Sequence, residues 1–150
     1  MRPLQSPRET GELANPAMGW RWLVSLVTGP DRWQRYRNSL KRQIAERGPI
    51  SEDAWQDPER LEVARAIERI LDDCCWGERF RFHPDDPYVV VGEFEAGDLS
   101  EVEALIEIEK KYGIRFNDKE MESFLRTNPT FGQFVDLVIE RKQIVSEEST

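Results

Sequence analysis

The residues best suited to acid–base chemistry lie in one short segment, His83-Pro84-Asp85-Asp86-Pro87. An imidazole beside carboxylates can act as a general acid or base. Prolines within and after the segment favour a turn, so we expect these polar side chains to hold a loop rather than a substrate. The sequence contains no phosphate-binding loop, nucleophile elbow or dinucleotide fingerprint. We therefore expect no catalytic residue and no enzyme activity.

The two cysteines, Cys74 and Cys75, are adjacent in the chain and follow an expected helix. Neighbouring cysteines rarely form a disulfide, and the dipole at a helix C-terminus disfavours a thiolate. With a single histidine in the chain, we expect no zinc site and no other bound metal. The apolar run at residues 20–27 is too short to span a bilayer. These features favour a reduced, cytoplasmic protein.

Charge is unevenly distributed along the 150 residues. Residues 1–50 contain nine Lys and Arg against four Asp and Glu, or +5, whereas residues 51–150 carry −13. The whole chain carries −8, which argues against general binding of nucleic acids because like charges repel at long range. A basic front therefore precedes a strongly acidic body.

The basic front is expected to contain a disordered tail at residues 1–18 and a helical extension at residues 19–50. Within the extension, a helix over residues 31–47 has one apolar face (Trp33, Tyr36, Leu40, Ile44). Its polar face is basic, with Arg32, Arg35, Arg37, Lys41 and Arg42. We expect this helix to pack on the acidic body of its own chain or of a second copy. The alternatives are another protein, then a membrane surface, then a nucleic acid.

The acidic body has the pattern of an all-α domain. Helical spacing predicts helices over residues 58–75, 99–112, 117–125 and 130–143, with a disordered tail at residues 143–150. Asp57 before Pro58, Asn117 before Asp118, and a capping box of Thr130 and Gln133 mark three of the helix starts. A long irregular segment, residues 76–98, contains the β-prone run YVVV at residues 88–91. Apolar periodicity predicts a core formed by Leu61, Ile67, Leu71, Val102, Leu105, Ile106, Tyr112, Phe116, Phe131, Phe134, Val135 and Val138.

Residues 58–142 resemble the acyl carrier protein family. The resemblance is carried by a helix, an aromatic residue, a turn and a threonine-capped last helix, with Leu99, Val102, Glu103, Leu105, Ile108, Tyr112, Phe116, Asp118 and Thr130 at the matching positions. It implies an acyl-carrier-like four-helix bundle, here with an N-terminal helical extension. It also implies a role in binding proteins rather than in catalysis.

The chain departs from the family at the residue that carries phosphopantetheine. The family has a serine there, whereas an alignment without gaps from Tyr112 places Asp98 in that position. A carboxylate cannot form the stable phosphodiester, so we expect no cofactor. The alternative is a divergent carrier that is modified at Ser100. Both Asp98 and Ser100 also have a glutamate three residues later, which is the pattern of a helix capping box.

The resemblance further implies a docking surface on the helix over residues 99–112. Its acidic residues are Glu101, Glu103, Glu107 and Glu109. In the family the corresponding helix docks on basic patches of partner proteins. We therefore expect a protein partner with a basic patch and no small-molecule substrate; the simpler interpretation is a solvated face with a Glu107–Lys111 pair.

Overall fold

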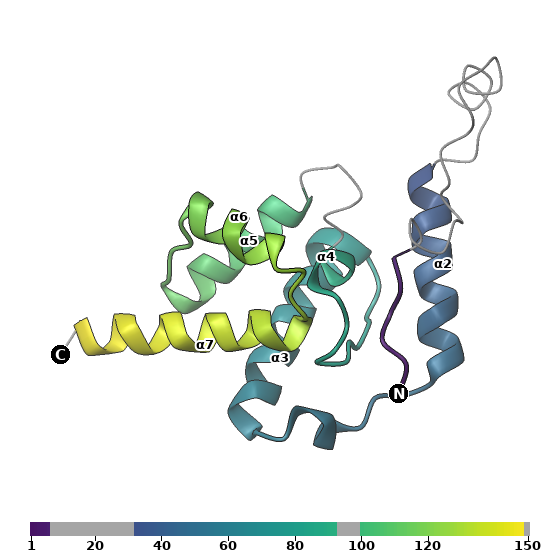
Figure 1. The fold of residues 1–150 in the computed structure, drawn as a ribbon, viewed down its shortest axis with the longest axis horizontal. Helices are drawn as coiled ribbons and strands as arrows, with labels where there is room; N and C mark the ends of the chain where they lie inside the picture. The colour runs from purple at the N-terminus through teal and green to yellow at the C-terminus, as the bar shows by residue number, and fades with distance from the viewer. Residues whose placement is uncertain (7–31, 93–99, 149–150) are drawn as a thin grey trace, which may run out of the picture. The chain divides into compact units, whose positions relative to one another are not determined.

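The computed structural model describes residues 1–6, 32–92 and 100–148, and within these ranges the chain is helical and contains no β-strand. The all-α prediction is confirmed for this part of the chain (Figure 1). The chain divides into two compact units, Met1–Gly48 and Pro49–Thr150. Residues 19–31 of the expected helical extension lie outside the described residues.

The described part of the first unit comprises an extended segment, residues 1–6, and beside it helix α2, Arg32–Arg47. Gln43 joins them, because its Oε1 accepts a hydrogen bond from Gln5 N at 2.9 Å and its Nε2 donates to Gln5 O at 3.0 Å. Tyr36 and Leu40 are buried, as their spacing predicts. The helix ends before Gly48, whose φ of 72° suits a residue without a Cβ atom.

The second unit begins with a short 3-10 helix, Glu52–Trp55, and continues with α3, Pro58–Leu71. Asp57 caps α3 as predicted: its Oδ1 accepts hydrogen bonds from Glu59 N at 2.7 Å and Arg60 N at 3.3 Å. The helix then widens into a π-helical segment, Asp72–Trp76, in which Gly77 N donates to Asp72 O five residues earlier. The π-helical segment turns the indole of Trp76 inward, where Nε1 donates to Val91 O at 3.0 Å.

The β-prone run YVVV forms a short helix, α4, Tyr88–Val91, within the segment that the sequence predicts to be irregular. Val90 N and Val91 N both donate to Pro87 O, which closes a helical turn. Val90 and Val91 are fully buried. Burial of these two branched side chains in one turn outweighs their intrinsic preference for strands.

Three helices complete the second unit: α5, Ser100–Tyr112; α6, Asp118–Arg126; and α7, Phe131–Glu148. Gly113 ends α5 with a φ of 64°, and Asn117 caps α6 by accepting from Lys119 N. The predicted capping box of α7 is confirmed, because Thr130 N donates to Gln133 Oε1 and Gln133 N donates to Thr130 Oγ1. The last helix extends to Glu148, beyond its expected end at residue 143.

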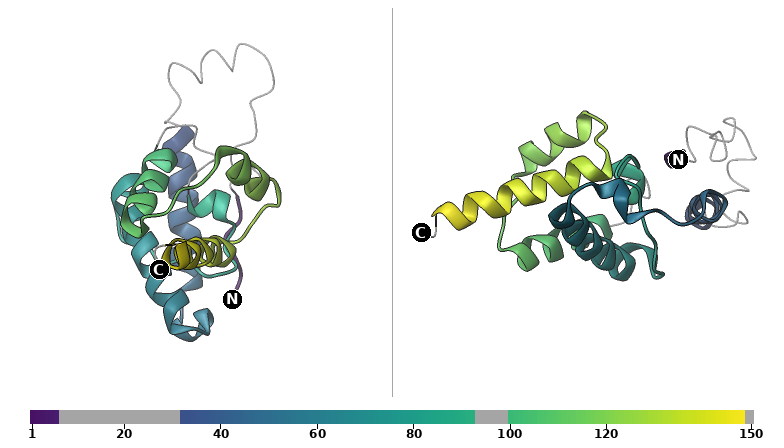
Figure 2. Two further views of the ribbon diagram at one scale, coloured as in Figure 1. Left: turned by 90° about the vertical axis from the view of Figure 1, so that its left-hand side faces the viewer. Right: turned by 90° about the horizontal axis from the view of Figure 1, so that it is seen from below.

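Helix α3 packs against both α5 and α7, and α4 also packs on α7 (Figures 1 and 2). Arg60 links the beginning of α3 to α7, because its Nε and Nη2 donate to the two carboxylate oxygens of Asp136 at 2.7 and 3.0 Å. The interior is aromatic: the ring of Phe134 stacks on Tyr88 with centroids 4.0 Å apart, and Phe131 meets Trp55 and Phe82 edge-on. This aromatic cluster joins the 3-10 helix, the segment around Phe82 and α4 to α7.

The predicted core is confirmed for Ile67, Leu71, Phe131, Phe134, Val135 and Val138, which are all buried. Two members are wrong, because Val102 is 45% exposed and Ile106 is 43% exposed. Large buried residues that lie outside the expected helices complete the interior instead: Trp55, Trp76, Phe82, Tyr88, Val90 and Val91.

Candidate functional site

Helix α5 has one buried side and one side open to solvent. Ala104 and Ile108 are buried, and the helix packs against α3 and the segment Asp72–Trp76. Val102 and Ile106 are four residues apart, so they lie one turn apart on the opposite side. They are two of the few large apolar side chains exposed among the described residues. The apolar residues of this helix therefore lie on two faces, and only one of these faces is buried in the core.

The four acids predicted on this helix have different environments. Glu103 is exposed, and Glu107 accepts a hydrogen bond from Lys110 Nζ at 2.6 Å rather than forming the expected pair with Lys111. Glu109 closes the end of the helix: its carboxylate accepts from Phe116 N at 2.7 Å and contacts Arg115 Nη1 at 3.2 Å. Glu101 is half-buried, and the structure shows no donor for its Oε2 within the described ranges. Two acids, Glu103 and Glu107, thus accompany the exposed apolar pair.

We call Val102, Glu103, Ile106 and Glu107 the docking face of α5. A groove with a volume of about 350 Å³ continues from it around the C-terminal end of the helix. Ile106 is shared by both features, and the groove is further lined by Glu109, Lys110, Gly113, Ile114 and Arg115. The surface is therefore apolar in its centre, acidic toward the start of α5 and more basic toward its end.

Ser100 is the first residue of α5 and is half-buried. Asp98 lies outside the described residues, so the structure does not describe its environment. The basic residues predicted for the extension all belong to α2: Arg35 and Arg42 are exposed, and Arg37 and Lys41 are half-buried. The side chain of Arg32 lies outside the described part of the chain.

The segment with His83, Asp85 and Asp86 forms a hydrogen-bonded turn. Asp86 is buried, and its Oδ2 accepts from His83 N at 2.7 Å, while Asp85 N donates to His83 Nδ1 at 3.2 Å. The turn is bonded to the start of α7, because Phe131 N donates to Asp86 O at 2.7 Å and Gly132 N donates to Pro84 O at 2.8 Å. These contacts position α7.

A pair of buried carboxylates, Glu68 and Asp72, escaped the sequence prediction. Glu68 Oε1 accepts from Phe82 N at 2.8 Å, and Asp72 Oδ1 accepts from Phe80 N at 2.9 Å. Burial raises the pKa of both acids, and the amide hydrogen bonds and nearby arginines oppose that shift. The signal in the sequence was two acids four residues apart on the apolar stripe of α3. They hold residues 80–82 against the helix.

Cys74 is half-buried and Cys75 is buried, and both are free thiols. The pKa of Cys74 is raised, first by burial and then by the negative charges of Glu103, Glu107 and Asp73. Two acids of the docking face, Glu103 and Glu107, therefore contribute to the raised pKa of this thiol. Among the described residues, no three His, Cys, Asp or Glu side chains are grouped so as to hold a metal ion.

We predict that Cys74 reacts with iodoacetamide more slowly than free cysteine, because the reacting species is the thiolate. Replacing Glu103 and Glu107 together with glutamine should increase the rate at pH 8 by roughly two- to fivefold, since two negative charges are removed. Peptide mass spectrometry separates Cys74 from Cys75. The control is Glu122→Gln, an exposed acid on α6; an unchanged rate in the double variant would refute the electrostatic effect.

No family model, no curated protein and no solved structure matches this chain. No helix in the described part of the chain is long and apolar enough to cross a membrane. The geometry of the chain's own residues therefore carries the functional interpretation.

Proposed function

We propose that the chain is a non-catalytic, acyl-carrier-like binding module that docks a protein partner with a basic patch through α5. The observation that carries the proposal is the exposure of Val102 and Ile106, one turn apart and beside Glu103. The succession of α3, α5, the short α6 and α7 also accords with the order of helices implied by the resemblance. The acyl-carrier-like bundle is part of this proposal.

The apolar pair supplies the affinity of such a contact. Fully burying a valine or isoleucine side chain stabilises a complex by about 1.5–3 kcal/mol. Because each is already partly covered, we expect about half of that per residue. Single exposed apolar residues are ordinary on protein surfaces. A pair on one helix face, with a groove at one end, forms a continuous surface that a partner side chain can fill.

The charges supply orientation and speed of association. Residues 51–150 carry −13, and the first turn of α5 holds Glu101 and Glu103 without a basic residue. The last turn holds Lys110 and Lys111. A basic patch on the partner is therefore attracted toward the start of the helix, and complementary charges of this kind raise association rates and fix the direction of docking.

The absence of a prosthetic group is supported by the residue types at the attachment position. Asp98 replaces the serine of the family, and a carboxylate cannot form the phosphodiester bond. The alternative, a carrier modified at Ser100, is favoured by one observation: Ser100 begins α5, the helix that carries the attachment serine at its start in the family. One measurement separates these two candidates.

That measurement is the intact mass after incubation with coenzyme A and a phosphopantetheinyl transferase. We expect no change in mass, with a genuine carrier protein as the positive control for the enzyme. A gain of one phosphopantetheine group that disappears in Ser100→Ala would establish the carrier alternative. A gain that persists in Ser100→Ala would also refute the proposal and place the attachment elsewhere.

The docking face is tested with charge and size variants of the full chain. The immobilised chain should capture a partner protein from cell extract. We expect Glu103→Lys, and Val102→Ser combined with Ile106→Ser, each to raise the Kd of that contact by about tenfold or more, so that capture is lost. Added salt should weaken capture, because the charge attraction is screened. The matched controls are Glu140→Lys and Ile144→Ser on α7, an exposed acid and an exposed apolar residue. Equal loss in the control variants, or none in the face variants, would refute docking through α5.

A further inference from the structure

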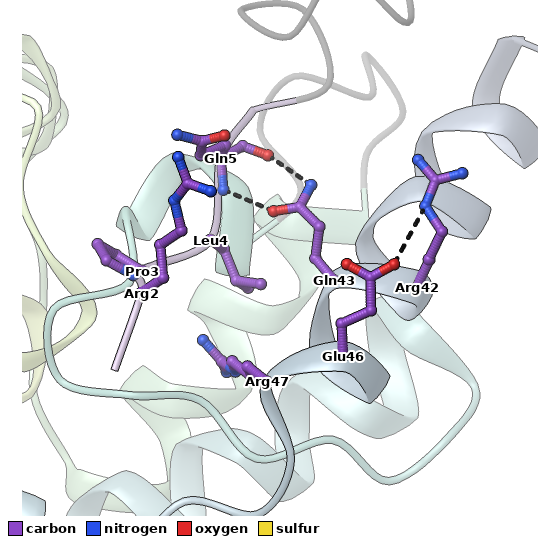
Figure 3. A pocket seen from close by; sticks show the side chains of 8 residues that line it. All are labelled: Arg2, Pro3, Leu4, Gln5, Arg42, Gln43, Glu46 and Arg47. Atoms are coloured by element: carbon purple, nitrogen blue, oxygen red, sulfur yellow. Dashed lines mark hydrogen bonds and ion pairs between the residues drawn. The ribbon is translucent and has the colours of Figure 1, made fainter.

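The first unit contains a cavity of about 340 Å³ between residues 2–5 and the last two turns of α2 (Figure 3). Eight residues line it: Arg2, Pro3, Leu4, Gln5, Arg42, Gln43, Glu46 and Arg47. Three of these are arginines, and they come from two segments about forty residues apart in the chain. The cavity has a volume in the range of small-ligand sites, which begins at about 300 Å³.

Hydrogen bonds join the two walls of the cavity. The Gln43 amide bonds to both the N–H and the C=O of Gln5, so the extended segment is fixed to the helix. Leu4 is buried and anchors the same segment.

The charge of the lining selects the ligand. Arg2, Arg42 and Arg47 contribute three positive charges, and Glu46, whose Oε1 lies 4.0 Å from Arg42 Nε, contributes one negative charge. The C-terminus of α2 adds a partial charge equivalent to about −0.5. The described residues of the lining therefore sum to between one and two positive charges, and a phosphate monoester carries about −1.5 to −2 at pH 7.

We propose that this cavity binds a phosphate monoester. The planar guanidinium group donates two parallel hydrogen bonds to phosphate oxygens, which a lysine cannot do. The cavity is larger than one phosphate group, so the ligand also carries an organic portion that contacts Pro3 and Leu4. The site is independent of α5 and of the proposed docking function, because its lining residues all belong to the first unit.

The test is a titration of the full chain with each probe, monitored by NMR and by calorimetry at constant ionic strength. The probes are inorganic phosphate, glycerol 3-phosphate, and phosphatidylcholine vesicles with and without phosphatidic acid. We expect saturable binding of glycerol 3-phosphate, weakened about tenfold by Arg42→Gln and by Arg47→Gln, because each removes a charge-assisted pair. Arg42→Lys should retain part of the affinity, since it keeps the charge but not the planar fork.

The control variant is Arg35→Gln, an exposed arginine of α2 outside the cavity lining. Circular dichroism shows whether each variant remains folded. Binding of phosphatidic acid vesicles with the same arginine dependence would identify a lipid headgroup as the source of the phosphate, and binding of soluble esters alone would identify a free metabolite. Binding that does not saturate, or that falls equally in Arg35→Gln, would show general charge attraction and refute the proposal. Failure of every probe to bind would also refute it.

Discussion

The variant Phe134→Ala should lose about 3–5 kcal/mol of unfolding free energy, which is a large share of the stability of a domain this size. Phe134 is fully buried on α7. Its ring stacks on Tyr88 at an interplanar angle of 13° and also meets Phe116 and Phe124. Truncation removes contacts with α4, with α6 and with the segment before it, and these rigid elements cannot close the cavity.

The measurement for Phe134→Ala is a urea unfolding curve monitored by circular dichroism, with the midpoint and the slope reported separately. Ile144→Ala is the matched control, because it truncates an apolar residue on the same helix that is 38% exposed. We expect the control to change stability by less than about 1 kcal/mol. A similar small loss in Phe134→Ala would show that the aromatic cluster does not hold the second unit together.

The second large effect is expected for Glu68→Ala, at about 3 kcal/mol of lost stability. Glu68 is fully buried and accepts hydrogen bonds from Phe82 N and from Arg65 Nη1, both at 2.8 Å. Alanine leaves the buried amide without its acceptor and removes the charge that faces Arg65. Because the Arg65 side chain is 22% exposed, water compensates part of its lost pairing.

The variant Glu68→Gln separates the charge of Glu68 from its hydrogen bond. The pKa of Glu68 is raised in the folded protein above its ordinary value of 4.5. Between these two pKa values the native state therefore holds more protons than the unfolded state, so this group's contribution to stability falls as the pH rises. Glutamine keeps an acceptor for Phe82 N and does not titrate.

We expect the stability of the wild type relative to Glu68→Gln to decrease as the pH rises from 4.5 through the native pKa. Urea midpoints at closely spaced pH values measure this difference. The raised pKa of Asp72 gives a slope of the same sign, but Asp72 is present in both proteins and largely cancels. A difference that grows in favour of the wild type with increasing pH would contradict the raised pKa.

Sequence patterns predicted the helices where local chemistry dominates. Asp57 followed by Pro58, Asn117, and the pair Thr130 and Gln133 all cap helices at the expected positions. These signals are reliable because the capping groups lie within three residues of the amides that they satisfy. The helical turn at residues 88–91 was not predicted, because there the local preference for strands is overruled by burial against α7, which lies some forty residues further along the chain.

The candidate site was harder to predict than the fold. The four glutamates of α5 lie close together in the sequence, yet the carboxylate of Glu109 accepts a hydrogen bond from Phe116 N while Glu103 is exposed. The apolar residues of the same helix divide in the same way, with Ile108 buried and Ile106 exposed. Periodicity shows that a face is apolar, but only the position of α3 decides which apolar face is covered. The Gln43 contact with Gln5 spans thirty-eight residues and left no local signal.

The packing of α3 against α7 has a consequence for how the protein is made. Ile67 and Leu71 lie on a helix near the start of the second unit, whereas Phe134, Val135 and Val138 come from its last helix. The ribosome synthesises chains from the N-terminus at about 5–20 residues per second. Until the last of these residues has left the exit tunnel, the side of α3 that packs on α7 stays uncovered, although α5 is already available to it. The second unit therefore completes its folding only after nearly all of it has been translated.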